Sequence, residues 1–240
     1  MRCNIVFTKV IIRGFMDELK LNVMKRVILF IVILALLIFI PSWTFLYWQG
    51  WIYLLVISIS LLSMTLYFLN HDRALMERRI KIGPQAEKKK IQKVIQSFYI
   101  ILLITLVLKS VIDHRFVLSN VPNVLNIISN LLVLIGIYII YSVFKENSFA
   151  SATIEVDKEQ KVISTGPYSI VRHPMYSGAL LLFIFTPIAL GSIFGLIPAV
   201  LLITILMFRT LDEEKSLNKE LSGYLDYCKN IKFRLIPYIW

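Results

Sequence analysis

Six strongly apolar runs, separated by short polar segments, restrict how this chain can fold more than any other feature. They cover residues 27–40, 51–69, 98–108, 121–144, 175–190 and 192–208. Hydrophobic residues make up 58% of the 240 residues, with a mean hydropathy of +0.74. A chain this apolar needs lipid to cover its surface. The sequence therefore predicts an all-α integral membrane protein, a multi-span helical bundle of about five to six transmembrane segments.

The lengths of the runs divide the chain into two parts. Runs 27–40, 98–108 and 175–190 are shorter than the roughly 20 residues of a spanning helix, so they are either extended by their flanks or partly re-entrant. Only the region of Gly191 separates the last two runs, which predicts a tight helical hairpin. We expect N-terminal transmembrane helices in residues 1–144. Residues 145–240 then form a unit with a polar loop, the hairpin and a cytoplasmic helical segment.

The basic residues predict the orientation of the bundle. If all six runs cross the membrane, only Lys109 and Arg115 lie on one side, which leaves 24 of the 26 Lys and Arg residues on the other. Because basic loops stay cytoplasmic, we expect both termini in the cytoplasm. On the outer side, the sequence predicts an aromatic belt of Trp43, Tyr47, Trp48, Trp51 and Tyr53.

Two further features argue against nucleic acid and metal ions as partners. The basic stretch 77–90 is compatible with nucleic acid, but it lies between two membrane runs, so contact with anionic lipid headgroups is the better interpretation. The two cysteines, Cys3 and Cys228, are far apart in polar flanks and indicate neither a disulfide framework nor a metal site. We therefore expect no nucleic acid and no metal.

The stretch GPYSIVRHPMYSG, residues 166–178, places polar groups at the start of an apolar run. A proline favours the first position of a helix, so Pro174 predicts a helix start whose free N–H groups form an anion site. Arg172, His173 and Tyr176 lie within about one turn of it and can add donors. The alternative is an interfacial helix start with a snorkelling arginine and an amphipathic tyrosine. Because polar clusters at membrane depth are costly, we favour a functional site.

The polar end of the last run carries a second group of charges. Arg209 and Glu213 are four residues apart and share a helix face, whereas Glu214 points about 100° away. Asp212 and Glu214 are interpreted as a solvated helix end. Arg209 either snorkels to the interface or pairs with a ligand anion. A carboxylate site at His173 and an ammonium site at Glu213 would suit a zwitterionic amino-acid head.

This pair of motifs resembles a known family. The pattern GPYxxVRHPMYxG, followed across a hydrophobic hairpin by RxxxEExxL and GYxxY, is similar to the isoprenylcysteine carboxyl methyltransferases. More broadly, it resembles the integral-membrane methyltransferases that include phospholipid N-methyltransferases. The match covers about 95 residues at the C-terminal end. The matching residues are Gly166, Pro167, Tyr168, Val171, Arg172, His173, Pro174, Met175, Tyr176, Gly178, Arg209, Glu213, Glu214, Leu217, Gly223, Tyr224, Tyr227, Arg234, Leu235, Ile236 and Pro237.

The resemblance implies S-adenosyl-L-methionine as methyl donor, with S-adenosyl-L-homocysteine as product, bound at the cytoplasmic side of the hairpin. It implies that Arg209 is catalytic and that Arg209 and Glu214 contact the acceptor. The chain has no GxGxxG motif, so no Rossmann domain is expected to hold the cofactor. The implied cofactor-binding residues are Gln160, Lys161, Val162, Ile163, Tyr168, Arg172, His173, Pro174, Met175, Tyr176 and Glu213.

The acceptor stays open. The family favours a lipophilic carboxylate of isoprenylcysteine type, which needs no base. A phospholipid amine or a thiol has to lose a proton, and Glu213 or Glu214 are then candidate bases. Many members carry a histidine where this chain has Gln160 or Lys161, and the bacterial-looking chain suggests a cell-membrane enzyme. An NADPH-dependent reductase similar to the sterol reductases, or a membrane transporter or scaffold, are the competing interpretations.

Overall fold

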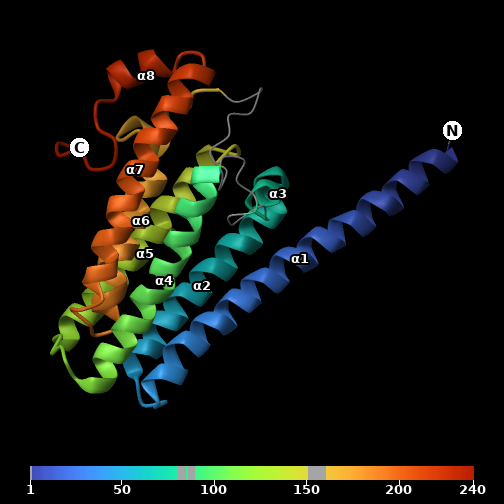
Figure 1. The fold of residues 1–240 in the computed structure, drawn as a ribbon. Helices are drawn as coiled ribbons and strands as arrows, with labels where there is room; N and C mark the ends of the chain where they lie inside the picture. The colour runs from blue at the N-terminus through green and yellow to red at the C-terminus, as the bar shows by residue number, and fades with distance from the viewer. Residues whose placement is uncertain (1, 81–84, 86–89, 151–160) are drawn as a thin grey trace.

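A computed structural model describes residues 2–80, 85, 90–150 and 161–240 of the chain. Within these ranges the secondary structure consists of helices without strands, which confirms the predicted all-α class, while the predicted count of five to six spans stays a prediction (Figure 1). The helices are α1 (Arg2–Ser42), α2 (Trp48–His71), α3 (Arg73–Ile80), α4 (Lys90–Phe116), α5 (Asn123–Glu146), the short 3-10 helix η2 (Gly166–Ser169), α6 (Pro174–Ala189), α7 (Leu196–Glu220) and α8 (Tyr224–Asn230).

Four helices in the described ranges are long and apolar enough to cross a membrane. Their spans are Glu18–Ser42, Trp48–His71, Gln92–Phe116 and Asn123–Glu146. The short runs 27–40 and 98–108 are therefore extended by their flanks. For these two runs, the extended interpretation replaces the re-entrant one. Helix α6 has only 16 residues, and α7 joins an apolar first half to a charged second half. The hairpin that they form packs against α2, α4 and α5.

Helix α6 is the centre of the bundle, because it contacts α2, α4, α5 and α7. Its closest approach is to α5, where two glycines face each other. A Cβ added at Gly178 would lie 2.6 Å from the carbonyl oxygen of Gly136, and one added at Gly136 would lie 2.8 Å from that of Gly178. Small residues allow two helix backbones to approach this closely. These two glycines therefore set the position of the helix that begins at the candidate site.

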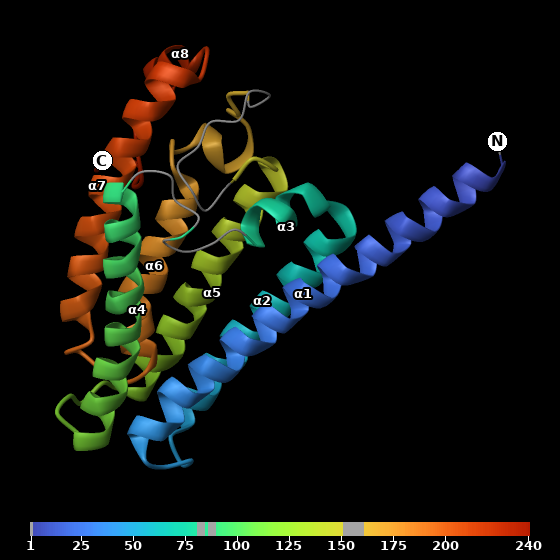
Figure 2. The ribbon, with the colours of Figure 1, turned by 45° about the vertical axis from the view of Figure 1, so that its right-hand side comes forward.

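Successive long helices run in opposite directions, so the two ends of the bundle differ (Figures 1 and 2). The N-terminal end of α1 lies at the same end as α3, η2 and α8, while the connections α1–α2, α4–α5 and α6–α7 lie at the other. The described parts of the basic segments thus lie at one end, as the charge pattern predicts. Both polar segments of the candidate site lie at that same end.

At the opposite end, the predicted tight hairpin is confirmed and is fixed by a buried carboxylate. Asp113 of α4 accepts hydrogen bonds from Ser192 Oγ at 2.5 Å and from the backbone N–H of Phe194 at 3.2 Å. The three tryptophans of the predicted aromatic belt are exposed, so their place in the belt stays a prediction, but the prediction is wrong for the two tyrosines. Tyr47 donates to the Leu190 carbonyl at 2.5 Å and Tyr53 is bonded to Thr186. They are buried because they bind α6, 133 or more residues away.

Candidate active site

The start of α6 and the charged half of α7 meet through one tyrosine. The Tyr176 hydroxyl donates to Glu213 Oε2 at 2.6 Å and accepts from Arg209 Nε at 3.3 Å. Arg209 also donates through Nη1 to Gln96 Oε1 of α4 at 2.9 Å. The prediction that Arg209 and Glu213 share a helix face is therefore confirmed. The arrangement links an anion-binding and a cation-binding side chain through a single neutral hydroxyl.

Glu214 is the centre of a separate buried ion-pair cluster. One of its oxygens lies 3.0 Å from Arg172 Nε and 3.3 Å from His173 Nε2, and the other accepts from Arg234 Nε at 2.8 Å. The Arg172 N–H is not aligned for a hydrogen bond, so this contact is an ion pair. Desolvation raises the pKa of Glu214, but the hydrogen bonds from His173 and Arg234 outweigh it and lower the pKa to about 2.

The interpretation of Glu214 as part of a solvated helix end is wrong, because the residue is only 7% exposed. Asp212 is half-buried and accepts a hydrogen bond from Gln92 Nε2 at 2.6 Å, so it too is engaged. Both oxygens of Glu214 are already bound by protein groups, and this carboxylate does not line the pocket described below. The predicted contact of Glu214 with substrate stays a prediction that this arrangement does not favour.

The C-terminal segment after α8 fixes the start of α6. The backbone N–H groups of Arg172 and His173 donate to the carbonyls of Phe233 and Arg234, each at 2.9 Å. Ser177 Oγ donates to the Leu235 carbonyl at 2.5 Å. These bonds attach the residues on both sides of Pro174 to the C-terminal segment. The motif RHP therefore has a structural role in addition to any role in ligand binding.

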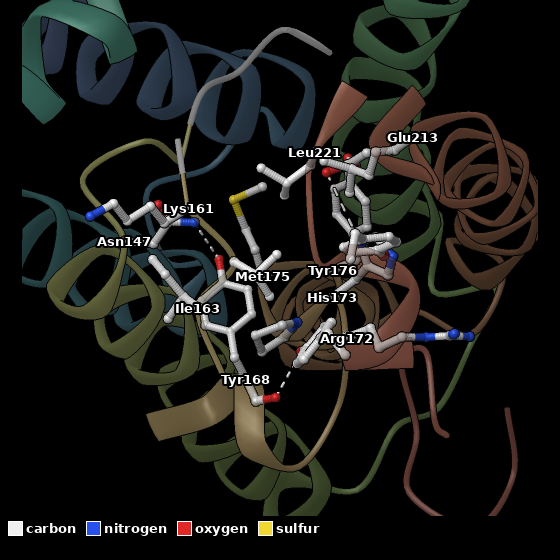
Figure 3. Close-up of a pocket in the computed structure, with 15 residues that line it drawn as sticks. Asn147, Lys161, Ile163, Tyr168, Arg172, His173, Met175, Tyr176, Glu213 and Leu221 are labelled. Carbon is white, nitrogen blue, oxygen red and sulfur yellow. Dashed lines mark hydrogen bonds and ion pairs between the residues drawn. The ribbon is translucent and has the colours of Figure 1, made fainter. Parts of the chain in front are cut away.

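One pocket lies between these elements (Figure 3). The start of α6, the second half of α7, α8 and the segment before η2 form its walls. The lining residues combine one carboxylate with basic, apolar and aromatic side chains. Its lining consists of Asn147, Lys161, Val162, Ile163, Tyr168, Arg172, His173, Pro174, Met175, Tyr176, Glu213, Leu217, Leu221, Tyr224 and Tyr227.

Three tyrosines form the aromatic side of the pocket. The Tyr168 hydroxyl accepts from Asn147 Nδ2 at 2.9 Å, and Tyr227 donates to the Tyr168 carbonyl at 2.7 Å (Figure 3). Burial raises the pKa of Tyr168 to about 12, so its hydroxyl stays protonated at neutral pH. The Tyr224 hydroxyl is buried with no hydrogen-bond partner among the described residues. A buried polar atom without a partner is costly, so this hydroxyl is suited to bind a ligand in the pocket.

Every predicted cofactor residue that the structure describes lines this pocket. Gln160 lies outside the described residues. Arg209 does not line the pocket but touches it through Tyr176. Five further residues line the pocket without a site role predicted from the sequence: Asn147, Leu217, Leu221, Tyr224 and Tyr227. Tyr224 and Tyr227 belong to the GYxxY pattern, where Gly223 with φ 81° starts α8 and turns both rings toward the site. The GYxxY pattern is therefore the sequence signal that could have identified Tyr224 and Tyr227 as site residues.

The chemistry of the lining fits S-adenosylmethionine. Glu213 is partly exposed and offers a carboxylate for an ammonium group, and the apolar and aromatic walls suit a nucleoside. Pro174 has no N–H, so the backbone N–H of Met175 is the first donor of α6. The cavity has a volume of about 90 Å³, whereas small-molecule sites typically enclose roughly 300 Å³ or more. A nucleoside-sized ligand thus fits only with a shift of the lining side chains.

Comparison with known proteins supports the resemblance. The model of a family described as phospholipid methyltransferase matches residues 124–222, which include α5, η2, α6 and α7. No match was found among curated proteins or among solved structures. The matched segment carries the helix start at Pro174 and the carboxylates at the end of α7. Residues 124–222 are therefore similar to a family of integral-membrane methyltransferases, the class that the sequence motifs resemble.

Proposed function

We propose that this protein transfers the methyl group of S-adenosylmethionine to a lipophilic acceptor held in the membrane. The favoured acceptor is a carboxylate of isoprenylcysteine type, and the active site and both termini face the cytoplasm. The observation that carries the proposal is the single pocket that contains every described residue of the predicted cofactor set. The link from Tyr176 to both Glu213 and Arg209 places the two motifs beside it.

When bound, the cofactor supplies a methyl group already activated by its sulfonium charge, so the protein mainly has to align the reactants and exclude water. Glu213 is the proposed partner of the donor's ammonium group. Met175 and His173, at the start of α6, line the same pocket, and the Met175 N–H is the proposed donor to the carboxylate of the cofactor. Tyr224 and Tyr168 add hydroxyl groups along the aromatic wall. In this scheme Lys161, Val162 and Ile163 close the opposite side.

Arg209 is the proposed catalytic residue because it lies next to the pocket and donates a hydrogen bond to Tyr176, which lines it. Its guanidinium is oriented by Gln96 and Tyr176. A carboxylate acceptor needs no base, so Arg209 only has to bind the carboxylate and point one oxygen at the methyl group. The acceptor's tail stays in the bilayer between the helices. An acceptor without a lipid tail that is methylated equally well would contradict this part of the proposal.

A second acceptor class is favoured by the description of the matched family, which names phospholipids. A phospholipid amine has to lose a proton before it can attack, and a thiol acceptor has the same requirement. Glu213 is the candidate base, because it is bonded to Tyr176 and is partly exposed to the pocket. In that case Glu213 would both bind the ammonium group of the donor and act as the base for the acceptor.

Transfer of radiolabelled methyl groups tests the proposal and separates the acceptors. Purified protein in liposomes is given S-adenosylmethionine labelled on the methyl group, with either N-acetyl-S-farnesylcysteine or phosphatidylethanolamine. Label extracted with the lipid fraction and released as methanol by mild base indicates a carboxyl ester. Base-stable label indicates an N-methyl product. We expect base-labile label with the farnesylcysteine and its loss in Arg209→Gln, and no label with either acceptor would refute the proposal.

A further inference from the structure

Arg79 is a cation that the sequence assigned to a headgroup-contacting loop but that faces the interior. It lies on α3, one turn after Leu75 and Met76, which are 0% and 8% exposed. Residues three and four apart share a helix face, so the Arg79 side chain lies on the buried face of α3. The helix is held in place from both sides. Asp72 caps it by accepting from the Leu75 N–H at 3.0 Å, and Arg26 donates to the Ile80 carbonyl at 2.8 Å.

The contacts of Arg79 are apolar or weakly polar. Its guanidinium carbon lies 4.2 Å from the centre of the Phe144 ring, and Nη1 lies 3.9 Å from the sulfur of Met175. Within the part of the chain that the structure describes, no carboxylate pairs with this guanidinium. Burial lowers the pKa of Arg79 to about 10. A partly buried cation needs a compensating anion, and no described protein group supplies one here.

Arg79 lies next to the pocket described above. Met175, whose sulfur it contacts, is itself part of the pocket lining. Met175 and Tyr176 are consecutive residues of α6, and Arg79 contacts the first while Arg209 donates to the hydroxyl of the second. Two guanidinium groups, one from α3 and one from α7, therefore lie beside the start of α6. One anionic group placed beside both guanidinium groups would reduce the repulsion between their positive charges.

We propose that Arg79 and Arg209 together form a binding site for the anionic group of the methyl acceptor, either a carboxylate or a phosphodiester. The proposal rests on the proposed function, which supplies the donor pocket next to this site. Arg79 is then a specificity-determining residue, because it selects acceptors that carry a negative charge near the methylated atom. A guanidinium that only snorkelled to bulk headgroups would lie on the lipid-facing side of α3, away from Phe144 and Met175.

Binding measurements without turnover test this site directly. The probes are N-acetyl-S-farnesylcysteine with its neutral methyl ester, and dioctanoyl phosphatidylethanolamine with neutral dioctanoylglycerol. Dissociation constants are measured by thermophoresis on the wild-type protein, Arg79→Gln and Arg79→Lys in detergent. The matched control is Arg78→Gln, because Arg78 is the neighbouring residue with the same charge but stacks on Phe149 and donates to the Ser148 carbonyl.

We expect the wild-type protein to bind one anionic probe about tenfold or more tightly than its neutral partner. The pair that shows this preference distinguishes a carboxylate from a phosphodiester. Arg79→Gln removes most of the preference, Arg79→Lys restores part of it, and Arg78→Gln keeps it. Equal affinity for charged and neutral probes, including no measurable binding of either, overturns the inference, as does a normal preference in Arg79→Gln.

Adenosylhomocysteine binding is measured on the same samples, so that the two proposals can fail separately. Intact adenosylhomocysteine binding in Arg79→Gln shows that the variant is folded and that only the acceptor site has changed. If the wild-type protein prefers anionic probes but does not bind adenosylhomocysteine, the anion site stands and the methyl donor is wrong. If it binds adenosylhomocysteine but shows no anion preference, the role of Arg79 is wrong and the donor site stands.

Discussion

Glu214→Gln should remove a specific part of the protein's stability and its dependence on pH. The carboxylate is buried and lies within 3.3 Å of side-chain nitrogens of Arg172, His173 and Arg234. These partners hold its pKa near 2, compared with an ordinary value of 4.5. A folded-state pKa below the unfolded value means that the charged form stabilises the native state. That stability is fully present above about pH 4.5 and is lost as the pH falls toward 2.

The size of the effect follows from the shift in pKa. One pKa unit corresponds to about 1.4 kcal/mol, so the full contribution of Glu214 is on the order of 3 kcal/mol. Between pH 5 and pH 3 the unfolded state gains most of its proton while the native state does not. About 2 kcal/mol of the contribution should disappear over this range. For a chain of this length, each kcal/mol shifts the unfolding midpoint by roughly 2–4 °C.

Thermal unfolding in detergent micelles, followed by circular dichroism at pH 5 and pH 3, measures this difference. We expect the midpoint of the wild-type protein to fall by about 4–8 °C more than that of Glu214→Gln. Glu220→Gln is the matched control, because Glu220 lies on the same helix and is exposed. It should follow the wild-type protein. If Glu214→Gln lost as much stability as the wild-type protein between the two pH values, the ion-pair account of Glu214 would be refuted.

Three further predictions concern packing and the site. Gly178→Ala places a methyl group against the Gly136 carbonyl and should cost about 1–3 kcal/mol, seen as a lower unfolding midpoint; an unchanged midpoint would contradict the close packing of α5 and α6. Tyr224→Phe removes an unpartnered hydroxyl, so stability should not fall, while calorimetry should show adenosylhomocysteine affinity reduced about tenfold; an unchanged affinity would exclude contact with the ligand. Tyr176→Phe disconnects Glu213 from its hydroxyl donor and should lower the methyl-transfer rate roughly 10- to 100-fold with the protein still folded; a normal rate would mean that this link does not matter for the reaction.

Local patterns predicted the all-α class and the helix start at the site, because they depend on short-range geometry, whereas most of the pocket residues were implied by the resemblance to a known family. The position of His173 before Pro174 predicted the helix start at Pro174, which the structure confirms. The spacing of Arg209 and Glu213 predicted a shared face because an α-helix repeats every 3.6 residues. Runs of apolar residues likewise predicted membrane helices, although not where each one ends.

Features that depend on distant contacts could not be predicted in this way. Glu214 looked solvated because its partner Arg234 is 20 residues away and approaches only when the C-terminal segment folds back over α6. Tyr47 looked like a belt residue because nothing local shows its bond to Leu190, 143 residues away. Arg79 sits in a strongly basic stretch, and only the packing of α3 against Phe144 turns it inward. At each of these positions, contacts with residues distant in the sequence determine whether the side chain is buried, and the local composition does not.

Calorimetry of adenosylhomocysteine binding to the detergent-purified protein tests the central claim most directly. The account predicts binding by the wild-type protein, an affinity lowered about 10- to 100-fold in Glu213→Gln, and no change in Glu220→Gln. Glu213 lines the pocket, whereas Glu220 is exposed further along the same helix. No binding by a folded wild-type sample, or equal binding by Glu213→Gln, would contradict the assignment of this pocket to the methyl donor.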